Sequence, residues 1–297
     1  MDKEPHVFIQ GRTKQLLSRG ILANKLTLFG ISFTEGYEFL IDVYQDILDL
    51  NQEVVPKSKI DEIISTHLAK TYNETLAEQY LKIEKWRDSR IPLWILIAGA
   101  IGAGKSTLSR KIAGDLGIQH VIGTDVVADI MRRILSQDIV PELHSKSYQA
   151  YKSLRPIYSS RFDEVILGFE NHSKYVNLGV DAVLSRAEKE NVSIVIEGEH
   201  LLPAFFDEAL LSKPNVIYIT ISVPDPDLHR ENLSSQYTKE KEELLSNFDN
   251  IRKIQEHLVN ETLIRKLPLV EARKGEDTTN IVRKLLVDRI VSLISSQ

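Results

Sequence analysis

Cysteine is absent from this chain of 297 residues. Its absence excludes disulfides, thiolate zinc sites, iron–sulfur clusters and cysteine nucleophiles. A chain without thiols or disulfides is typical of proteins that work inside the cell, so we expect a cytoplasmic location.

Long apolar segments are also missing. The longest apolar run, residues 92–101, has about half of the ~20 residues that a membrane-spanning helix needs, and it is typical of a buried strand. The first residues, MDKEPHVFIQGR, contain no apolar stretch typical of a secretory signal. The net charge is −5 and no basic tail or stripe is present. We therefore expect neither a membrane nor a nucleic acid as partner, and homo-oligomerisation stays open.

The apolar and charged fractions, 42% and 27%, are those of a globular protein. Residues 1–90 predict a strand at 7–11 and several short helices, with Ser58 as a helix N-cap and a connector helix over 72–87. Residues 89–92 mark a boundary, and residues 91–297 form the second predicted domain. The first domain is expected to be small and mainly helical.

Five apolar runs alternate with helical segments in the second domain. They cover residues 93–99, 120–124, 192–198, 215–223 and, more weakly, 267–272. Continuous apolar strands alternating with helices are typical of a parallel sheet covered on both faces. We predict an α/β domain with a five-stranded parallel sheet.

A phosphate-binding motif follows the first of these strands. Residues 99–107 read GAIGAGKST and match the pattern G-x-x-x-x-G-K-[ST] between an apolar strand and a helix. Glycines let consecutive amide groups turn toward a phosphate, and the positive end of the following helix points to the same place. We predict that this loop binds ATP with Mg²⁺. The predicted nucleotide-binding residues are Gly99, Gly102, Ala103, Gly104, Lys105, Ser106 and Thr107, with Lys105 also catalytic and Ser106 a metal ligand.

Two acidic residues stand where later strands end. Asp125 follows the second strand and is predicted to orient an acceptor hydroxyl or to take its proton, with helix N-capping as the alternative. Glu197 ends the third strand and is predicted to act near Mg²⁺, with loop bracing as the alternative. Arg132 is predicted to bind an anionic substrate, because the apolar positions Val126, Ile130 and Ile134 leave it nearer the cleft than Arg133.

The segment 141–156 is rich in hydroxyl and basic groups and is a natural acceptor-binding insertion. Its predicted substrate-binding residues are His144, Lys146, Tyr148 and Arg155. The polar stretch 227–249 is expected to be a lid, with Arg230 catalytic and Arg252 a further candidate for stabilising the transferred phosphoryl group. An exposed charged helix is the alternative for residues 239–243.

These segments together resemble one family. The run from IAGAIGAGKST through HVIGTDVVADIMRR, VPELHSKSYQAYKSL and SIVIEGEHLLP to DLHRENL is similar to the archaeal 2-phosphoglycerate kinases, and GRTKQLLSRGILANKLTLFGI resembles the ATP-cone module that precedes them. The resemblance implies transfer of a phosphoryl group from ATP to 2-phosphoglycerate, giving 2,3-bisphosphoglycerate on the way to cyclic 2,3-diphosphoglycerate. It also implies that Asp125 faces the C3 hydroxyl of this small anionic substrate. With the phosphate loop and this resemblance together, we predict an α/β P-loop NTPase kinase fold with a five-stranded parallel sheet in the order 2-3-1-4-5.

Three departures from that family keep alternatives open. The sequence ENLSSQ follows His229-Arg230 where the family usually has further arginines. IEGEHL stands where the family usually has IEGVHL, and LPLVEA in the fifth strand also departs from the family pattern. A kinase for another phosphorylated acid or a nucleoside, or an ATP-sensing regulator without catalysis, is the alternative function. A helical docking or dimerisation module is the alternative to the ATP cone.

Replacing Lys105 by Ala tests the phosphate-loop assignment. Turnover is expected to vanish, because the lysine is the cation assigned to the β- and γ-phosphates. ADP release in the presence of Mg·ATP and acceptor measures it. Retention of more than about a tenth of the activity would contradict the role of Lys105.

Overall fold

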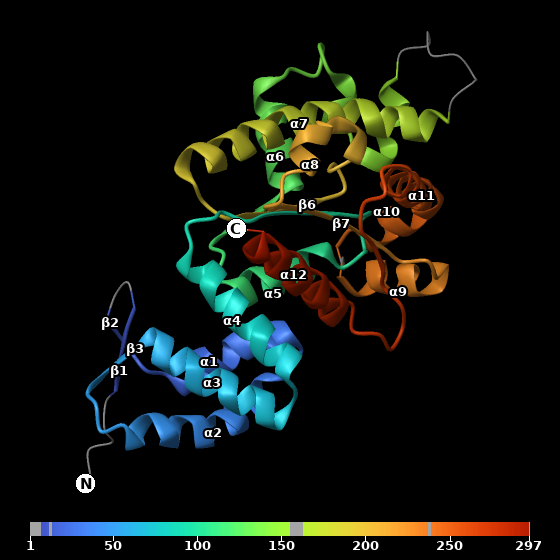
Figure 1. Ribbon diagram of the computed structural model, residues 1–297. Coiled ribbons are helices and arrows are strands. Elements are labelled where there is room, and N and C mark those ends of the chain that lie inside the picture. Colours follow the sequence, from blue (N-terminus) through green and yellow to red (C-terminus); the bar gives the residue numbers. More distant parts are fainter. Residues whose placement is uncertain (1–6, 12–13, 155–162, 237–238, 297) are drawn as a thin grey trace. The chain divides into compact units, whose positions relative to one another are not determined.

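The computed structural model describes residues 7–11, 14–154, 163–236 and 239–296 (Figure 1). The chain divides into two compact units, one of Met1–Ile91 with Asn280–Gln297 and one of Pro92–Thr279. The sequence placed residues 280–297 in the second domain, but they group with the first unit. The reason is packing, since Val287 lines one cavity together with Leu28, Phe29 and Leu76. Within the described part of the chain, no helix combines the length and hydropathy that a membrane span requires.

The first unit combines a small sheet with helices. The strand β1 pairs antiparallel with β2 and parallel with β3, in the order β2-β1-β3. The elements are β1 (Phe8–Gln10), β2 (Lys14–Leu16), α1 (Arg19–Leu26), the 3₁₀ turn η1 (Thr27–Phe29), α2 (Phe33–Asp49), β3 (Val54–Pro56), α3 (Lys57–Thr71), α4 (Glu74–Asp88) and α12 (Thr278–Ser295), of which residues 280–295 belong here.

Helix starts in this unit follow local capping chemistry. The Ser32 side chain accepts a hydrogen bond from the Glu35 amide, and the Asn73 side chain accepts one from Leu76. Asn73 therefore begins α4, and the connector helix does not extend back to Tyr72. The prediction that Ser58 caps a helix is wrong, because α3 begins at Lys57 and its N-cap position is Pro56.

The second unit contains a five-stranded, wholly parallel sheet in the order β5-β6-β4-β7-β8. Counted from the strand before Gly99, this order is 2-3-1-4-5. The elements are β4 (Trp94–Ala98), α5 (Lys105–Leu116), β5 (His120–Gly123), α6 (Thr124–Ile134), η2 (Pro141–His144), η3 (Ser147–Ser153), α7 (Glu164–Glu190), β6 (Ile194–Gly198), η4 (Pro203–Phe205), α8 (Glu208–Leu211), β7 (Val216–Ser222), α9 (Pro226–Gln236), α10 (Lys241–Ser246), α11 (Phe248–Ile264) and β8 (Leu269–Glu271).

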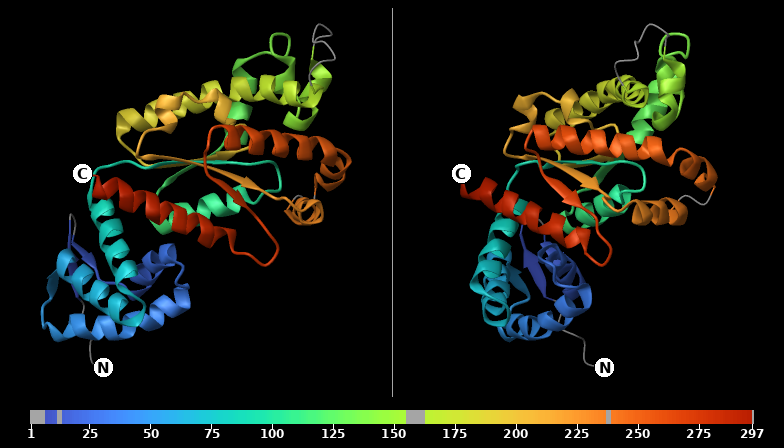
Figure 2. Two further views of the ribbon diagram at one scale, coloured as in Figure 1. Left: turned by 45° about the vertical axis from the view of Figure 1, so that its right-hand side comes forward. Right: turned by 90° about the vertical axis from the view of Figure 1, so that its right-hand side faces the viewer.

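Helices cover both faces of this sheet. Figure 1 and both views of Figure 2 show α6, α7 and α11 on one face and α5 on the other. Every residue of β4 and of β7 is buried, as expected of central strands with helices on both sides. On the α7 face, Leu96 and Ile196 of the sheet pack with Val176 and Val180 of the helix. This double cover leaves the carboxyl edge of the strands as the place for a ligand.

The apolar positions that share one side of α6 are not its buried side. Val126, Ile130 and Ile134 are 58%, 53% and 68% exposed. Val127 and Ala128 are the buried residues that pack toward the sheet and α7. Regular helical spacing shows that positions share a face, but it does not show which face the fold covers.

A buried carboxylate connects three helices of the first unit. Glu84 is 1% exposed and its Oε2 lies 2.7 Å from Lys25 Nζ and 3.0 Å from Lys57 Nζ, while Oε1 pairs with Arg87. Burial by itself would raise the pKa of Glu84, but the positive charges of Arg87, Lys25 and Lys57 outweigh it and lower the pKa to about 2. The ionised carboxylate therefore stabilises the packing of α1, α3 and α4.

The variant Glu84→Gln is expected to lower the free energy of unfolding by about 3 kcal/mol near neutral pH, because it leaves buried cations without their counter-charge. Since the folded pKa lies below the ordinary 4.5, this contribution is present above 4.5 and is lost as the pH falls toward about 2. Denaturant unfolding across that range should show the free energies of unfolding of the parent and of Glu84→Gln converging as the pH falls. Glu62→Gln removes an exposed ion pair with Lys59 and should change stability by less than about 1 kcal/mol. Equal effects of both variants would contradict this account.

Candidate functional site

The loop between β4 and α5 has the backbone that phosphate binding requires. Gly99, Gly102 and Gly104 have φ angles of +150°, +83° and +83°. A Cβ on Gly99 would lie 2.4 Å from the Ile221 carbonyl oxygen, and one on Gly102 would lie 2.7 Å from Leu233 Cδ2. Glycine is therefore required at both positions for steric reasons, and the loop leads directly into the N-terminus of α5.

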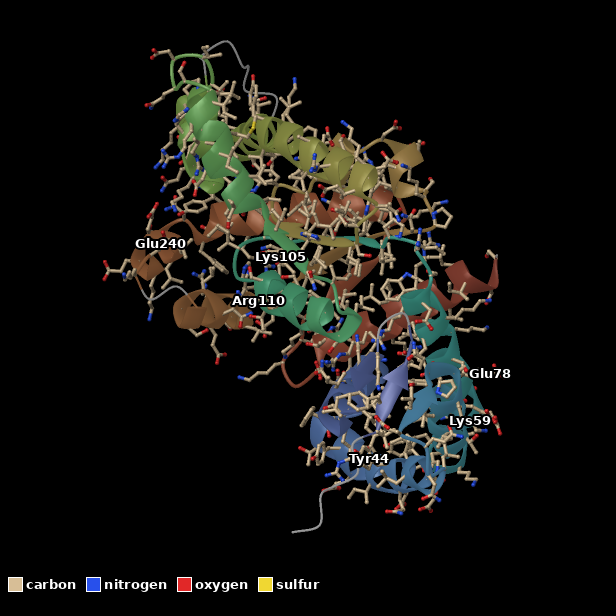
Figure 3. The ribbon with its side chains drawn as sticks, turned by 90° about the vertical axis from the view of Figure 1, so that its left-hand side faces the viewer. Tyr44, Lys59, Glu78, Lys105, Arg110 and Glu240 are labelled. Carbon is tan, nitrogen blue, oxygen red and sulfur yellow. The ribbon has the colours of Figure 1, made fainter. Side chains whose placement is uncertain are left out.

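Lys105 begins α5 and is 8% exposed. Its Nζ donates a hydrogen bond to the Ala100 carbonyl oxygen at 2.9 Å, so the ammonium group lies over the loop itself. Arg110 belongs to the same helix but is exposed to solvent (Figure 3). Both residues are cations on α5, but only Lys105, at the start of the helix, has its charge at the phosphate loop.

The two predicted metal ligands meet at the edge of the sheet. Ser106 Oγ donates a hydrogen bond to Glu197 Oε1 at 2.8 Å, although the residues lie 91 positions apart. A hydroxyl and a carboxylate at the end of the phosphate loop are oxygen donors that suit Mg²⁺, which usually keeps several waters and few protein ligands. Among the described residues no group of three or more His, Asp or Glu side chains could hold a metal by itself. These residues fit a metal that is shared with nucleotide phosphates.

Asp125 lies in the first turn of α6 and is exposed. The helix begins at Thr124 with Gly123 in the N-cap position, and no side chain caps it. The alternative that Asp125 serves as an N-cap is therefore not supported. Asp125 lines a cavity of about 270 Å³.

That cavity brings together residues from several predicted segments. Asp125, Arg132, Lys146 and Tyr148 line it, and so does Ile101 of the phosphate loop. The presence of Ile101 places the cavity directly beside the loop. Four predicted substrate-binding residues therefore share one hollow next to the predicted nucleotide site.

Neighbouring groups hold these side chains in place. Arg132 Nε donates to the Leu143 carbonyl oxygen at 2.7 Å and its Nη1 donates to Asp129 Oδ1 at 2.7 Å. Lys146 Nζ lies 3.3 Å from Glu240 Oε1, and both side chains are about half exposed. Arg132 is therefore preorganised, whereas Lys146 can exchange its partner at little cost.

Tyr148 is fully buried, and its hydroxyl donates to Glu243 Oε1 at 3.2 Å. Burial, together with the charge of Glu243, raises the pKa of this phenol, which therefore stays protonated and remains a hydrogen-bond donor. Glu243 belongs to α10, so this contact and the Lys146–Glu240 pair join the acceptor segment to the predicted lid.

Among the described residues, one predicted substrate-binding residue does not line the cavity. The His144 ring bonds through Nε2 to the Leu135 carbonyl oxygen at 2.7 Å and is not among the cavity residues. This contact ties the end of η2 to the end of α6. Arg155 lies outside the described residues.

Two buried histidines in the cavity wall complete the site. His172 of α7 and His200 stack with ring centroids 5.0 Å apart and an angle of 12° between the planes. Burial lowers the pKa of each to about 3, so both rings are neutral. The sequence analysis did not identify His172, because a histidine inside a long amphipathic helix carries no motif that distinguishes it.

Glu199 is a buried acid in the same wall. Ser147 Oγ donates a hydrogen bond to it. Burial, helped by the negative charge of Asp125, raises the pKa of Glu199 to about 7. The departure from the family pattern at this position therefore does not place a fully ionised carboxylate beside an anionic substrate at neutral pH.

The helix α9 braces the phosphate loop through neutral side chains. His229 is fully buried and its Nε2 lies 2.7 Å from the Ile101 carbonyl oxygen, while Asn232 Nδ2 donates to the Gly102 carbonyl oxygen at 3.1 Å. Arg230 is exposed, with its guanidinium 3.7 Å from the centre of the Phe248 ring. Arg252 donates to the Val223 carbonyl oxygen at 2.6 Å. Neither arginine lines the cavity.

Gly198 allows β6 to approach the start of α6. A Cβ there would lie 1.7 Å from Thr124 Oγ1, which is itself 2.7 Å from His200 Nδ1. Gly198→Ala is expected to lower stability by about 2 kcal/mol, because Thr124 must turn away and leave a buried partner unsatisfied. Gly114→Ala, at a helix position with nothing within 4 Å, should instead raise stability by up to about 1 kcal/mol. Thermal unfolding measures both, and an unchanged Gly198→Ala protein would contradict the packing described.

Comparison with known proteins places the chain in a family. No family model matches it. It is 33% identical to the 2-phosphoglycerate kinase of Methanopyrus kandleri, over 94% of this chain and 84% of the relative. It is 34% identical to that of Methanothermobacter thermautotrophicus, over 86% and 84%, and 33% identical to that of Methanocaldococcus jannaschii, over 99% and 95%.

A solved shikimate kinase from Acinetobacter baumannii in complex with shikimate covers 69% of this chain and 96% of its own, with 15% identity and a TM-score of 0.40, a likeness too distant to support an inference. The sequence relatives carry the assignment, because they exceed 30% identity over most of both chains. The chain belongs to the 2-phosphoglycerate kinase family.

Proposed function

We propose that this protein transfers the γ-phosphoryl group of ATP to the C3 hydroxyl of 2-phosphoglycerate, giving ADP and 2,3-bisphosphoglycerate. One observation carries the proposal above the others. A cavity with Arg132 and Lys146 in its wall also contains Ile101 of the phosphate loop, so an anion bound there lies next to the end of a bound nucleotide. Kinship with relatives named 2-phosphoglycerate kinase supplies the acceptor.

The residues divide between the two substrates. The amides of residues 99–106 and Lys105 Nζ would hold the ATP phosphates, and Ser106 and Glu197 would hold Mg²⁺. Mg²⁺, when bound, would neutralise charge on the β- and γ-phosphates. Lys105 now bonds to the Ala100 carbonyl oxygen, and the same ammonium group can turn to a phosphate oxygen without leaving the loop mouth.

The acceptor would lie in the cavity beside the loop. Arg132 and Lys146 offer fixed and adaptable cations for its phosphate and carboxylate. The Asp125 carboxylate would accept the hydrogen of the C3 hydroxyl. In the transfer, that oxygen forms a bond to the γ-phosphorus, the bond from phosphorus to the leaving oxygen of ADP breaks, and the hydroxyl proton passes to Asp125.

Neutral side chains suit the rest of this wall. The uncharged rings of His172 and His200 and the phenol of Tyr148 can form hydrogen bonds with oxygen atoms without adding charge. A mostly protonated Glu199 at slightly acidic pH would likewise act as a donor. The cavity thereby combines the cations Arg132 and Lys146 with polar neutral groups and with the carboxylates of Asp125, Asp129 and Glu240.

We further propose that residues 1–90 form an ATP-cone-like domain, which the small sheet with its surrounding helices supports. A docking or dimerisation module is the second candidate. It is favoured by Phe33, Tyr37 and Ile41, which lie one turn apart along α2 and are 49%, 37% and 51% exposed.

The direct test incubates the protein with Mg·ATP and 2-phosphoglycerate and follows the bisphosphate by ³¹P NMR. We expect product from the unaltered protein and a drop in kcat of about 100-fold for Asp125→Asn with ATP affinity retained. Asp138→Asn, an exposed aspartate outside the cavity, is the matched control and should behave as the parent.

The possible results separate the alternatives. Product formation by Asp125→Asn at more than a tenth of the parent rate would remove Asp125 from catalysis while leaving the reaction assigned. Transfer to other phosphorylated acids or nucleosides, with none to 2-phosphoglycerate, would redirect the acceptor assignment. ATP binding without ADP formation for any acceptor would identify a nucleotide sensor.

A further inference from the structure

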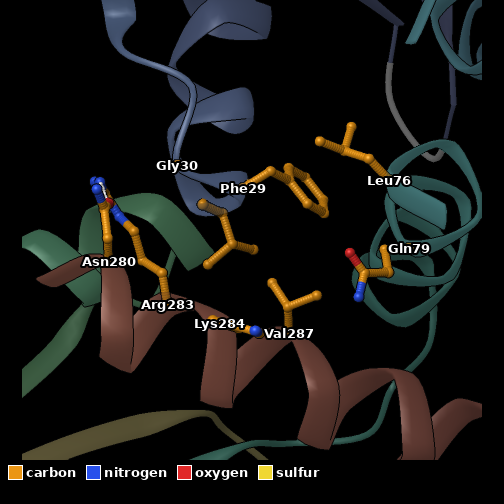
Figure 4. Close-up of a pocket in the computed structure, with 9 residues that line it drawn as sticks. Phe29, Gly30, Leu76, Gln79, Asn280, Arg283, Lys284 and Val287 are labelled. Carbon is orange, nitrogen blue, oxygen red and sulfur yellow. Dashed lines mark hydrogen bonds between the residues drawn. The ribbon is translucent and has the colours of Figure 1, made fainter. Parts of the chain in front are cut away.

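A second cavity lies inside the first unit and shares no residue with the candidate kinase site. Its volume is about 300 Å³. Its walls come from three segments far apart in the sequence: the turn from η1 into Gly30, the helix α4 and the C-terminal helix α12 (Figure 4). The cavity therefore exists only while α12 is packed on the rest of this unit.

One part of the wall is apolar. Leu28, Phe29, Leu76 and Val287 supply it, and Figure 4 shows the Phe29 ring between the turn and α4, with Val287 on the neighbouring helix. An aromatic ring and three aliphatic groups around one hollow favour a ligand with an apolar body.

The remaining wall is polar and basic. Its residues are Gln79, Asn280, Arg283 and Lys284, and no carboxylate is among the residues that line the cavity. Arg283 Nη1 donates to Asn280 Oδ1 at 3.0 Å, and Gln79 Nε2 donates to Asp288 Oδ1, outside the lining, at 3.4 Å. Lys284 forms no hydrogen bond or ion pair with any described residue. Two cations without a lining acid give this wall a positive potential.

We propose that this cavity is a binding site for a compact organic anion, whose apolar body packs on Phe29 and Leu76 and whose anionic group pairs with Lys284 and Arg283. The volume lies at the lower end of the range for small-molecule sites, which excludes a large ligand. Because the wall combines apolar groups with two neighbouring cations, neutral apolar molecules and bare inorganic ions are excluded as the best occupants. A carboxylate and a phosphate share the required chemistry.

Binding here would have a consequence for the C-terminal helix. A ligand that contacts η1, α4 and α12 together binds only the packed arrangement, so it stabilises that arrangement by mass action. Amide exchange in α12 should therefore slow when the ligand is present. This readout does not depend on catalysis.

Calorimetric titration of the full chain, with saturating Mg·ATP present, tests the proposal. The probes are phenyl phosphate and benzoate as anions with different head groups, benzyl alcohol as their neutral match, and inorganic phosphate as a head group alone. We expect one or both aromatic anions to bind, and the neutral and inorganic probes to bind at least about tenfold more weakly. The stronger of the two anions identifies the head group.

Three single-charge variants locate the site. Lys284→Gln should weaken the binding of the aromatic anion by about tenfold or more and abolish the slowing of amide exchange in α12. Arg289→Gln removes an exposed charge from the same helix outside the cavity, and Lys146→Gln removes a cation from the kinase cavity, so both should bind as the parent does.

Four outcomes would overturn the proposal. These are no binding of either anion at millimolar concentration, equal binding of benzyl alcohol, loss of affinity in Lys146→Gln instead of Lys284→Gln, and equal loss in Lys284→Gln and Arg289→Gln. The first two reject the ligand class, and the last two reject the location.

Discussion

The in-register parallel pairing of β4 with β6 is the constraint on which the site depends. It sets Ile97 opposite Glu197 and Ala98 opposite Gly198, so the two strands end at the same level of the sheet. The chain leaves β4 through the phosphate loop and leaves β6 through Glu199 and His200. A shift of one residue in this pairing would turn Glu197 to the other face of the sheet and separate it from Ser106.

The parallel pairing of β5 with β6 places a third strand end at the same edge. Gly123 lies opposite Glu197, so α6 begins beside the loop and Asp125 comes to the edge where Lys105 lies. Close approach is possible because Gly198 has no side chain to meet Thr124. Three strand ends therefore bring a cation, a predicted metal ligand and a candidate base to one place, and the intervening helices add the cavity wall.

Burial controls the charge of that wall. His172 and His200 are neutral because the interior disfavours their protonated forms, and burial beside Asp125 raises the pKa of Glu199 to about 7. The first unit shows the opposite result for Glu84, where three cations outweigh burial and keep the carboxylate ionised. The same desolvation thus yields neutral histidines in the cavity wall and a charged link between helices, depending on the number of nearby counter-charges.

The sequence by itself determined the parallel sheet, the phosphate loop and the acids at the strand ends. These features depend on local rules: apolar runs form buried strands, the glycine spacing permits positive φ, and a residue that directly follows a strand lies at the edge of the sheet. The sequence could also predict four residues of the cavity beside the phosphate loop, because they lie in segments that follow a strand or contain unusual numbers of polar groups. They are Asp125, Arg132, Lys146 and Tyr148. The resemblance to a family added the acceptor, which no local pattern contains.

Only the tertiary structure decided which distant segments meet. His172 and His229 look like ordinary helix residues until packing sets one against His200 and the other against the phosphate loop. The outward face of α6 and the grouping of α12 with the first unit were likewise undetermined, because spacing defines a face but not its partner. Long-range packing also determined which carboxylates are charged, since ionisation depends on neighbours that lie many positions away in the chain.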